Sequence, residues 1–188
     1  MKNKNGFTLI ELLAVIVILG ILMVAAIPAI SNSITKSRKD TFVTNAKKII
    51  DAARTSMASG EVTLQDGGIC QYPAQDKTTI INLFNNNENI LPYLLERGGA
   101  KSSFGQDYKA GYVIIHNKGT TGDYYDYYIT IVDAGGNGIS MPIKEDALAR
   151  GNIATSNAGL GVPDLANSAT VKLGESTKEI QYKCIIQK

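Results

Sequence analysis

The stretch GFTLIE, residues Gly6–Glu11, opens an apolar run that continues to Ile30. From Phe7 to Ile30 the run is 24 residues long, and a helix of that length, at about 1.5 Å per residue, crosses a hydrocarbon core of about 30 Å. Glu11 is the one charged residue in the run, and a carboxylate inside lipid is costly unless it has a partner or a function. The sequence therefore predicts a membrane-spanning helix with an acid close to its start, behind a polar leader at 1–6.

The order of these residues resembles the class III signal of type IV prepilins. The shared features are a cut-site glycine, an aromatic residue, a glutamate and an uninterrupted apolar run, followed here by Pro28. The resemblance implies that a dedicated peptidase cuts between Gly6 and Phe7 and methylates the new terminal amine of Phe7. It also implies that Glu11 acts in assembly, by neutralising the terminal amine of a neighbouring subunit. The resemblance covers the N-terminal helix, and the rest of the chain is similar to the family only loosely.

Two simpler explanations of the apolar run stay open. A general secretory signal peptide has a basic start, a shorter apolar segment and small residues before its cut site, and Val24 and Ala26 meet the last requirement. The length of the run and the charge of Glu11 disfavour this alternative. A plain membrane anchor is the second. We prefer the prepilin signal because it accounts for both the length and the glutamate.

Charge is distributed unevenly along the chain. Residues 31–58 hold six basic and two acidic side chains, a net charge of +4, whereas 59–188 hold 11 basic and 14 acidic side chains, a net charge of −3. The basic segment is either a solvated helix face or a surface that contacts acidic neighbouring domains in a polymer. It lacks interleaved aromatics, so no specific nucleic-acid binding is predicted. Basic residues after the apolar run oppose the positive-inside rule, but the prepilin resemblance and the cysteines favour export.

The apolar helix is expected to continue beyond the membrane as one long helix. No Pro or Gly interrupts Ala29–Ser59, and Gly60 is the expected end of the helix. Apolar residues recur there every three or four positions, which predicts a stripe for a soluble domain to pack against; they are Ile34, Phe42, Ala46, Ile49, Ala53 and Met57. Pro28 removes one backbone hydrogen bond and is expected to kink the helix. In pilins a proline at this place marks where the helix bends or melts during assembly.

The remaining residues predict a head domain of mixed structure. We expect a loop at 61–77, a second helix at 78–97 and then strands. The strand predictions are 112–116, 124–132, 139–143, 171–173 and 179–187, with a hairpin at 117–123, a turn at 134–138 and an irregular surface loop at 151–169. The expected fold class is α+β, with the long N-terminal helix packed on an antiparallel sheet, which also resembles the pilin fold.

Cys70 and Cys184 are the only cysteines in the sequence. An even pair in an exported domain indicates a disulfide, which would join the loop after the long helix to the last strand. The alternative is a buried thiol, which suits Cys184 on the apolar face of its strand better than Cys70 in a Gly-rich loop. A catalytic cysteine is disfavoured.

The other chemically active residues support no enzyme. His116, the only histidine, ends an apolar strand and is interpreted as a strand-end residue. Asp133 and Asn137 flank a Gly-rich segment, which is either a calcium loop or a tight turn; its spacing does not match an EF-hand. The tyrosines at 124–128 are either a binding surface or, for half of them, core. We therefore expect no enzyme, no metal site and no cofactor.

The resemblance implies a structural subunit of an extracellular type IV pilus that serves adhesion, surface motility or related functions. The expected organisation is a cleaved leader at 1–6, a transmembrane and filament-core helix at 7–30, an amphipathic half at 31–58 and a globular head at 59–188. The resemblance implies self-association, a prepilin peptidase, an assembly ATPase and a membrane platform protein as partners. Before assembly the chain would cross the membrane once with its head outside the cytoplasm. The alternatives are a pseudopilin of a secretion or DNA-uptake machine, and a secreted or anchored binding module.

Overall fold

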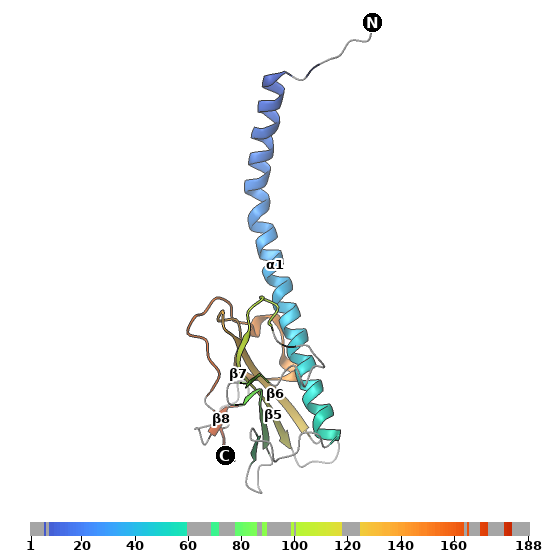
Figure 1. Ribbon diagram of the computed structural model, residues 1–188, viewed down its shortest axis with the longest axis vertical. Helices are drawn as coiled ribbons and strands as arrows, with labels where there is room; N and C mark the ends of the chain where they lie inside the picture. The colour runs from blue at the N-terminus through green and yellow to red at the C-terminus, as the bar shows by residue number, and fades with distance from the viewer. Residues whose placement is uncertain are drawn as a thin grey trace. The chain divides into compact units, whose positions relative to one another are not determined.

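The computed structural model describes residues 6, 8–59, 69–71, 78–85, 88–89, 99, 101–117, 125–163, 165, 170–172 and 179–181. The chain forms two compact units, Met1–Ser37 and Arg38–Lys188. Helix α1 (Leu9–Ser59) contributes its first part to one unit and its last part to the other (Figure 1).

Helix α1 runs without interruption from Leu9 to Ser59, as the sequence predicts. It passes through Pro28, which has no N–H and so leaves one carbonyl of the preceding turn without its helical donor. It ends at the residue before Gly60, the expected stop. Whether the helix bends at Pro28 during assembly stays a prediction.

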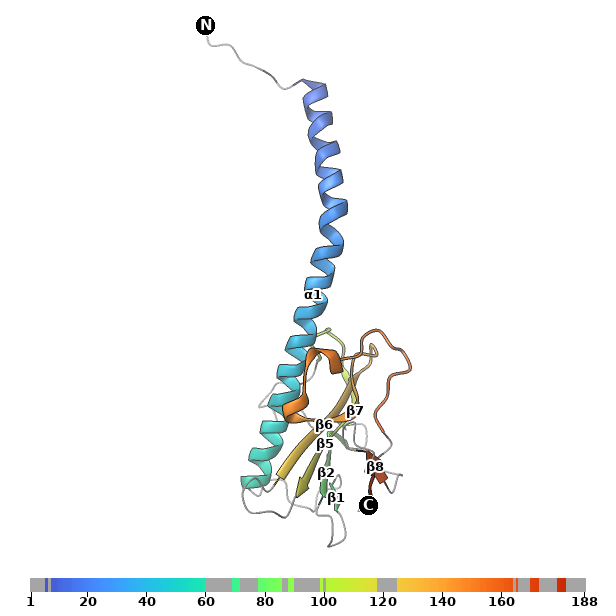
Figure 2. The same cartoon turned by 180° about the vertical axis from the view of Figure 1, so that it is seen from behind.

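The second unit contains a five-stranded antiparallel sheet with the strand order β1-β2-β5-β6-β7. Its strands are β1 (Ile69–Gln71), β2 (Thr78–Asn82), β5 (Tyr108–Asn117), β6 (Tyr125–Asp133) and β7 (Gly138–Lys144). Two short two-stranded sheets accompany it: β3 (Phe84–Asn85) with β4 (Glu88–Asn89), and β8 (Thr170–Lys172) with β9 (Glu179–Gln181). Two 3₁₀ helices follow β7, namely η1 (Glu145–Ala147) and η2 (Arg150–Asn152). The strands lie alongside the C-terminal part of α1 (Figure 2), so the α+β layout, similar to that of type IV pilins, is confirmed.

The core of this unit lies between α1 and one face of the sheet. Five helix residues are buried there: Phe42, Ala46, Ile49, Ile50 and Ala53. They meet strand residues that alternate along β2, β5, β6 and β7, namely Ile81, Val113, Ile115, Ile129, Ile131 and Ile139. Four of the helix residues belong to the stripe that the spacing predicts, and Ile50 adds to it. Ile34, in the first unit, is 48% exposed, and the side chain of Met57 lies outside the described part of the chain.

The opposite face of the sheet is buried as well. Ile80, Ile114 and Val132 are fully buried although they lie outside the core cluster under the helix. Their neighbours Ile81, Val113 and Ile131 point toward the helix, and successive side chains of a strand point to opposite faces. Strands β2, β5 and β6 therefore carry consecutive apolar residues at 80–81, 113–115 and 131–132, because both faces of the sheet are covered there.

The strands around residues 108–144 confirm the sequence interpretation. Antiparallel pairing of Asn117 with Tyr125 makes β5 and β6 a hairpin, whose connecting residues lie outside the described part. Strand β6 ends at Asp133 and β7 begins at Gly138, with the predicted turn between them. On β6, Tyr127, Ile129 and Ile131 face the core as expected.

The prediction of a helix at 78–97 is wrong for the residues that the structure describes, because these form β2, β3 and β4. Residues 90–98 lie outside the described residues. Thr78, Thr79, Ile80 and Ile81 are all β-branched, and such residues lose side-chain freedom in a helix but pack well on a sheet. Pairing with β5 buries both isoleucines, and this tertiary gain outweighs the helix-like spacing.

Three further boundaries differ from expectation. The loop at 61–77 contains β1, while the rest of that segment lies outside the described residues. The described part of 151–169 is irregular as predicted, but it is not confined to the surface, because Ile153 and Leu165 are buried. Strands β8 and β9 lie where the last strands were expected, yet they pair with each other and not with the five-stranded sheet.

Candidate assembly sites on the helix and the head domain

Thr8 and Glu11 form a capping box at the start of α1. The backbone N–H of Thr8 donates to Glu11 Oε2 at 2.8 Å, and the Thr8 hydroxyl donates to the same oxygen at 2.9 Å. In return the N–H of Glu11 lies 3.3 Å from Thr8 Oγ1. A helix start leaves four N–H groups without partners, and this reciprocal arrangement satisfies two of them. The cap gives Glu11 a role within its own subunit, and the spacing Thr-x-x-Glu is the sequence signature of such a cap.

Gly6 is exposed ahead of this cap, and a Cβ added to it would meet no atom within 4 Å. The fold of the chain therefore does not itself require glycine at this position. Phe7 lies outside the described residues. Cleavage between Gly6 and Phe7 and methylation of Phe7 stay predictions.

The first unit presents an apolar helix surface on all sides. The large apolar residues of α1 from Leu9 to Ile30 are all about half exposed or more within the chain. Among the described residues, α1 is the one helix long and apolar enough to cross a membrane. Such a surface needs lipid or another apolar surface to cover it.

Comparison with known families matches residues 1–27 to the prokaryotic N-terminal methylation motif. The comparisons with curated proteins and with solved structures found no match for this chain. The motif is the class III signal of type IV prepilins, so the chain carries the signal of a pilin-like or pseudopilin-like prepilin.

The methylation motif implies processing by a prepilin peptidase and self-polymerisation into a pilus-type fibre. With the apolar helix, it supports anchoring in the membrane before assembly. Proteins with this motif are structural and generally without enzymatic activity.

The turn between β6 and β7 is organised around the buried carboxylate of Asp133, which is 1% exposed. Asp133 Oδ1 accepts hydrogen bonds from the backbone N–H groups of Gly135 and Asn137, each at 2.9 Å. The amide of Asn137 donates to both carboxylate oxygens at 3.0 and 3.1 Å, and Ser102 Oγ donates to Oδ2 at 2.6 Å. Asn137 Oδ1 in turn accepts from the N–H of Ser156 at 3.0 Å.

These donors decide between the two interpretations of the 133–138 segment. A calcium ion is held by oxygens, whereas Asn137 turns its NH₂ group, a donor, toward Asp133. The carboxylate is surrounded by N–H and O–H groups that already balance its buried charge. The structure therefore favours the tight turn, which links β6 to the segments around Ser102 and Ser156.

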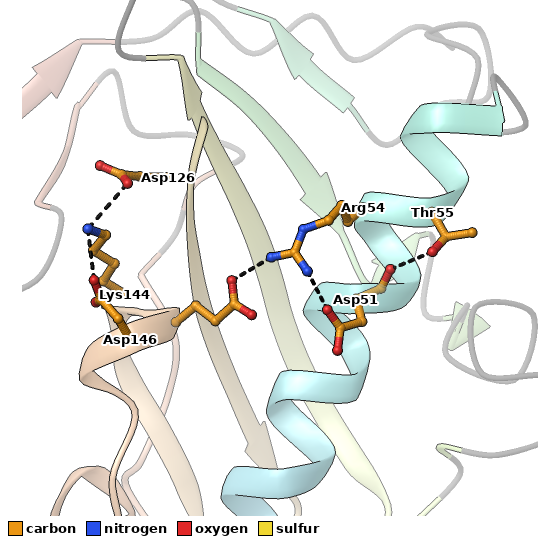
Figure 3. Close-up of polar contacts among 7 residues, drawn as sticks. Asp51, Arg54, Thr55, Asp126, Lys144 and Asp146 are labelled. Carbon is orange, nitrogen blue, oxygen red and sulfur yellow. Dashed lines mark hydrogen bonds and ion pairs between the residues drawn. The ribbon is translucent and has the colours of Figure 1, made fainter. Parts of the chain in front are cut away.

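A second polar cluster joins α1 to η1 in the head domain (Figure 3). Arg54 of α1 pairs with Asp51 one turn earlier and donates from Nη2 to Glu145 Oε2 at 2.5 Å. Its guanidinium carbon also lies 4.4 Å from the ring centroid of Tyr127, a cation–π contact. Arg54 thus connects the last turns of the helix to β6 and to η1, and its partner Glu145 in η1 lies 91 positions away in the sequence.

Lys144 forms the other half of this cluster. Its Nζ lies 3.2 Å from Asp126 and 3.0 Å from Asp146, and hydrogen bonds to Asp146 and Asp126 raise the pKa of the Lys144 ammonium. Between the two halves is an open groove of about 570 Å³. We call it the Lys47 groove; its lining residues are Lys47, Arg54, Tyr125, Asp126, Tyr127, Lys144, Glu145 and Asp146.

The other residues singled out in the sequence take structural places or fall outside the description. Cys70 lies on β1 opposite Ile80, but Cys184 lies outside the described residues, so the disulfide stays a prediction. His116 lies near the end of β5, partly buried, opposite Thr78 and Asp126. Of the tyrosines, Tyr125 is 50% exposed, those at 127 and 128 are partly buried, and the one at 124 lies outside the described residues.

Proposed function

We propose that this chain is the structural subunit of an extracellular type IV pilus, cleaved after Gly6, methylated at Phe7 and polymerised through α1. One observation carries the proposal: the helix that bears the methylation motif continues, without a break, into the core of a folded head domain. A subunit of this kind exposes an apolar helix for burial in a fibre and places a stable domain outside it.

In this proposal the apolar surface of α1 leaves lipid and packs against α1 of neighbouring subunits. Glu11 then lies among apolar helices, where an unpaired carboxylate is strongly unfavourable. The methylated terminal amine of Phe7 on a neighbour supplies the opposite charge. Pro28 supplies a weak point in the helix for the change of environment. The partners are other copies of the chain, a prepilin peptidase, an assembly ATPase and a membrane platform protein, and the assembled pilus serves adhesion or surface motility.

Two measurements test this proposal in the native host. The exported protein should yield an N-terminal peptide that begins at Phe7 and carries one added methyl group by mass spectrometry. Electron microscopy of the cell surface should show fibres that contain the chain. Fibres confined to the cell envelope would favour a pseudopilin of a secretion or DNA-uptake machine, and an unprocessed exported chain would contradict both functions.

The matched variant is Gly6→Leu. It should fold normally, because a side chain at this position meets nothing in the structure. It should nevertheless stay at full length in the membrane, since the requirement for glycine then comes from the peptidase. Normal processing of Gly6→Leu would contradict the class III interpretation of the cut site.

We also propose a disulfide between Cys70 and Cys184. Closing a loop of this length stabilises the fold by about 4 kcal/mol in the chain-entropy treatment. Alkylation of the exported, unreduced protein followed by mass measurement should find both thiols protected, and reduction should release both. Two thiols that are alkylated without reduction would contradict the bridge.

A further inference from the structure

The Lys47 groove and the 101–107 turn have different positions along α1. The turn contacts the helix near its residue 38, where Ser103 Oγ donates to the carbonyl of Arg38 at 2.7 Å. The groove is lined from the helix by Lys47 and Arg54. At about 1.5 Å per residue, the helix positions Arg38 and Lys47 are roughly 14 Å apart along the axis. The head domain therefore carries two distinct polar surfaces that are offset along its helix.

The groove contains a cation without a described acidic partner. Its acids are already paired with Arg54 or Lys144. Lys47 is exposed and makes no ion pair with any acid in the described part of the chain. An occupant of the groove is therefore expected to bring a carboxylate to Lys47.

The 101–107 turn offers such a carboxylate. The side chain of Asp107 is 73% exposed, and its ion pair with Lys101 is loose at 3.9 Å. The backbone behind it is well fixed, because Ser102 N–H donates to the carbonyl of Gln106 at 2.8 Å and Ala134 N–H donates to the carbonyl of Asp107 at 2.8 Å. A turn held in this way loses little conformational entropy when it docks.

An open fibre needs contacts of this kind. A helical polymer of identical subunits is built from a heterologous interface, in which one surface of each subunit meets a different surface of the next. If α1 helices pack side by side with an axial offset, heads are displaced along the helix direction. A displacement of about the distance between the two surfaces brings the turn of one head to the groove of another.

We infer that the Lys47 groove is a docking surface for a second copy of this chain, with Asp107 of that copy paired to Lys47. The inference rests on the proposed function, because it requires a polymer. It adds a head-to-head contact to the association of the apolar helices. Since both side chains are exposed, the pair sets the register between heads and contributes less to the gross stability of the fibre.

Charge reversal in the full-length chain, expressed in the native host, tests the pair. Lys47→Glu places an acid opposite Asp107, and like charges that face each other at an interface repel, so fibre yield should fall by at least about tenfold. Adding Asp107→Lys to Lys47→Glu should restore the yield. The matched control is Lys48→Glu, which reverses the adjacent exposed cation outside the groove and should assemble like wild type.

A cross-link tests the geometry independently. Subunits carrying Lys47→Cys, mixed with subunits carrying Asp107→Cys, should give a disulfide-linked dimer from intact fibres after mild oxidation. The mixture of Lys48→Cys with Asp107→Cys should give markedly less. Thermal unfolding of each variant should match wild type, because these side chains are exposed.

Each outcome has a defined meaning. Normal assembly of Lys47→Glu, or absence of the specific cross-link, would overturn the inference while fibres of the wild-type chain leave the proposed function standing. A defect in Lys47→Glu that Asp107→Lys does not repair would overturn Asp107 as the partner of Lys47, and the inference with it. Absence of fibres from the wild-type chain would overturn the proposed function and this inference with it.

Discussion

The hydroxyl of Ser102 donates a 2.6 Å hydrogen bond to the buried carboxylate of Asp133, which joins two segments 31 positions apart. Through Asn137 the same carboxylate is connected to the N–H of Ser156. Three segments without regular structure are thus fixed to the end of β6: the 101–107 turn, the turn at 134–137 and the segment around Ser156. The 101–107 turn, which we infer to dock on a neighbouring head, owes its defined position to this network.

Asp133→Ala should destabilise the head domain substantially. The change leaves Ser102, the amide of Asn137 and two backbone N–H groups without their acceptor in a buried site. Each unsatisfied buried group costs about 1–3 kcal/mol, so we expect a loss of roughly 3 kcal/mol or more in the free energy of unfolding. Urea unfolding of the full chain in detergent measures it. Asp107→Ala removes an exposed acid nearby and should change the free energy of unfolding by no more than about 0.5 kcal/mol. Equal effects of the two variants would contradict the role of Asp133 as the shared acceptor of these hydrogen bonds.

Gly136→Ala should also be destabilising, for a reason of backbone geometry. Gly136 has a φ of +74°, and an added Cβ would lie 2.1 Å from the carbonyl oxygen of Asn157. The turn and the 154–157 segment must separate to relieve this overlap, at an expected cost of roughly 2 kcal/mol or more. Gly151→Ala is the matched control, because nothing lies within 4 Å of its added Cβ, and it should be neutral or slightly stabilising. A neutral Gly136→Ala in thermal unfolding would contradict the close packing of these two segments.

The buried phenol of Tyr108 should make the free energy of unfolding decrease at alkaline pH. Its ring packs against Phe42 with 5.8 Å between centroids, and burial raises its pKa from 10.0 to about 12. In the unfolded chain the phenol ionises first, so the stabilisation is fully present below about pH 10 and is lost as the pH rises toward about 12. The loss attributable to this residue is about 2–3 kcal/mol. Tyr108→Phe keeps the ring without a titratable group, so its unfolding free energy should fall less steeply over this pH range; parallel curves would contradict the assignment.

The sequence predicts those parts of the fold that depend on local signals. The end of α1 follows from Gly60, and the turn after β6 from the glycines at 135, 136 and 138. The helix stripe from Phe42 to Ala53 follows from its spacing. The sequence wrongly predicts a helix from Thr78 because Ile80, Ile81 and Phe84 also suit one helix face, and only the pairing of β2 with β5 decides against it.

Among the candidate sites, too, those made of contiguous residues can be predicted from the sequence, and those assembled by tertiary structure cannot. The prepilin-type signal is recognisable from the sequence because its residues are contiguous, and the spacing of Thr8 to Glu11 also predicts the cap. The cut site and the assembly role of Glu11 stay predictions. The link from Arg54 to Glu145 is not legible, since it joins residues 91 positions apart and depends on where η1 packs. The groove that this link borders is likewise a product of tertiary structure.

The last prediction separates two roles of Glu11. In the single chain its carboxylate caps the start of α1 by accepting from the N–H and the hydroxyl of Thr8. In the proposed fibre its charge neutralises the terminal amine of a neighbour. Glu11→Gln keeps an acceptor for Thr8 but removes the charge, whereas Glu11→Ala removes both.

Both variants should still be cut after Gly6 and should remain in the membrane, because loss of a charge makes the apolar helix easier to accommodate in lipid. Loss of the cap alone costs about 1 kcal/mol, which the long apolar helix tolerates. Loss of the charge leaves the amine of a neighbour unpaired in a low-dielectric core, which is far more costly. We therefore expect Glu11→Gln and Glu11→Ala to be equally defective in forming fibres, and Glu11→Asp to be intermediate because its shorter side chain reaches less far. Fibre counts by electron microscopy, with the N-terminal mass as a check on processing, measure this. Abundant fibres of Glu11→Gln but not of Glu11→Ala would assign the requirement to the cap, and abundant fibres of Glu11→Ala would show that apolar packing alone sets the register.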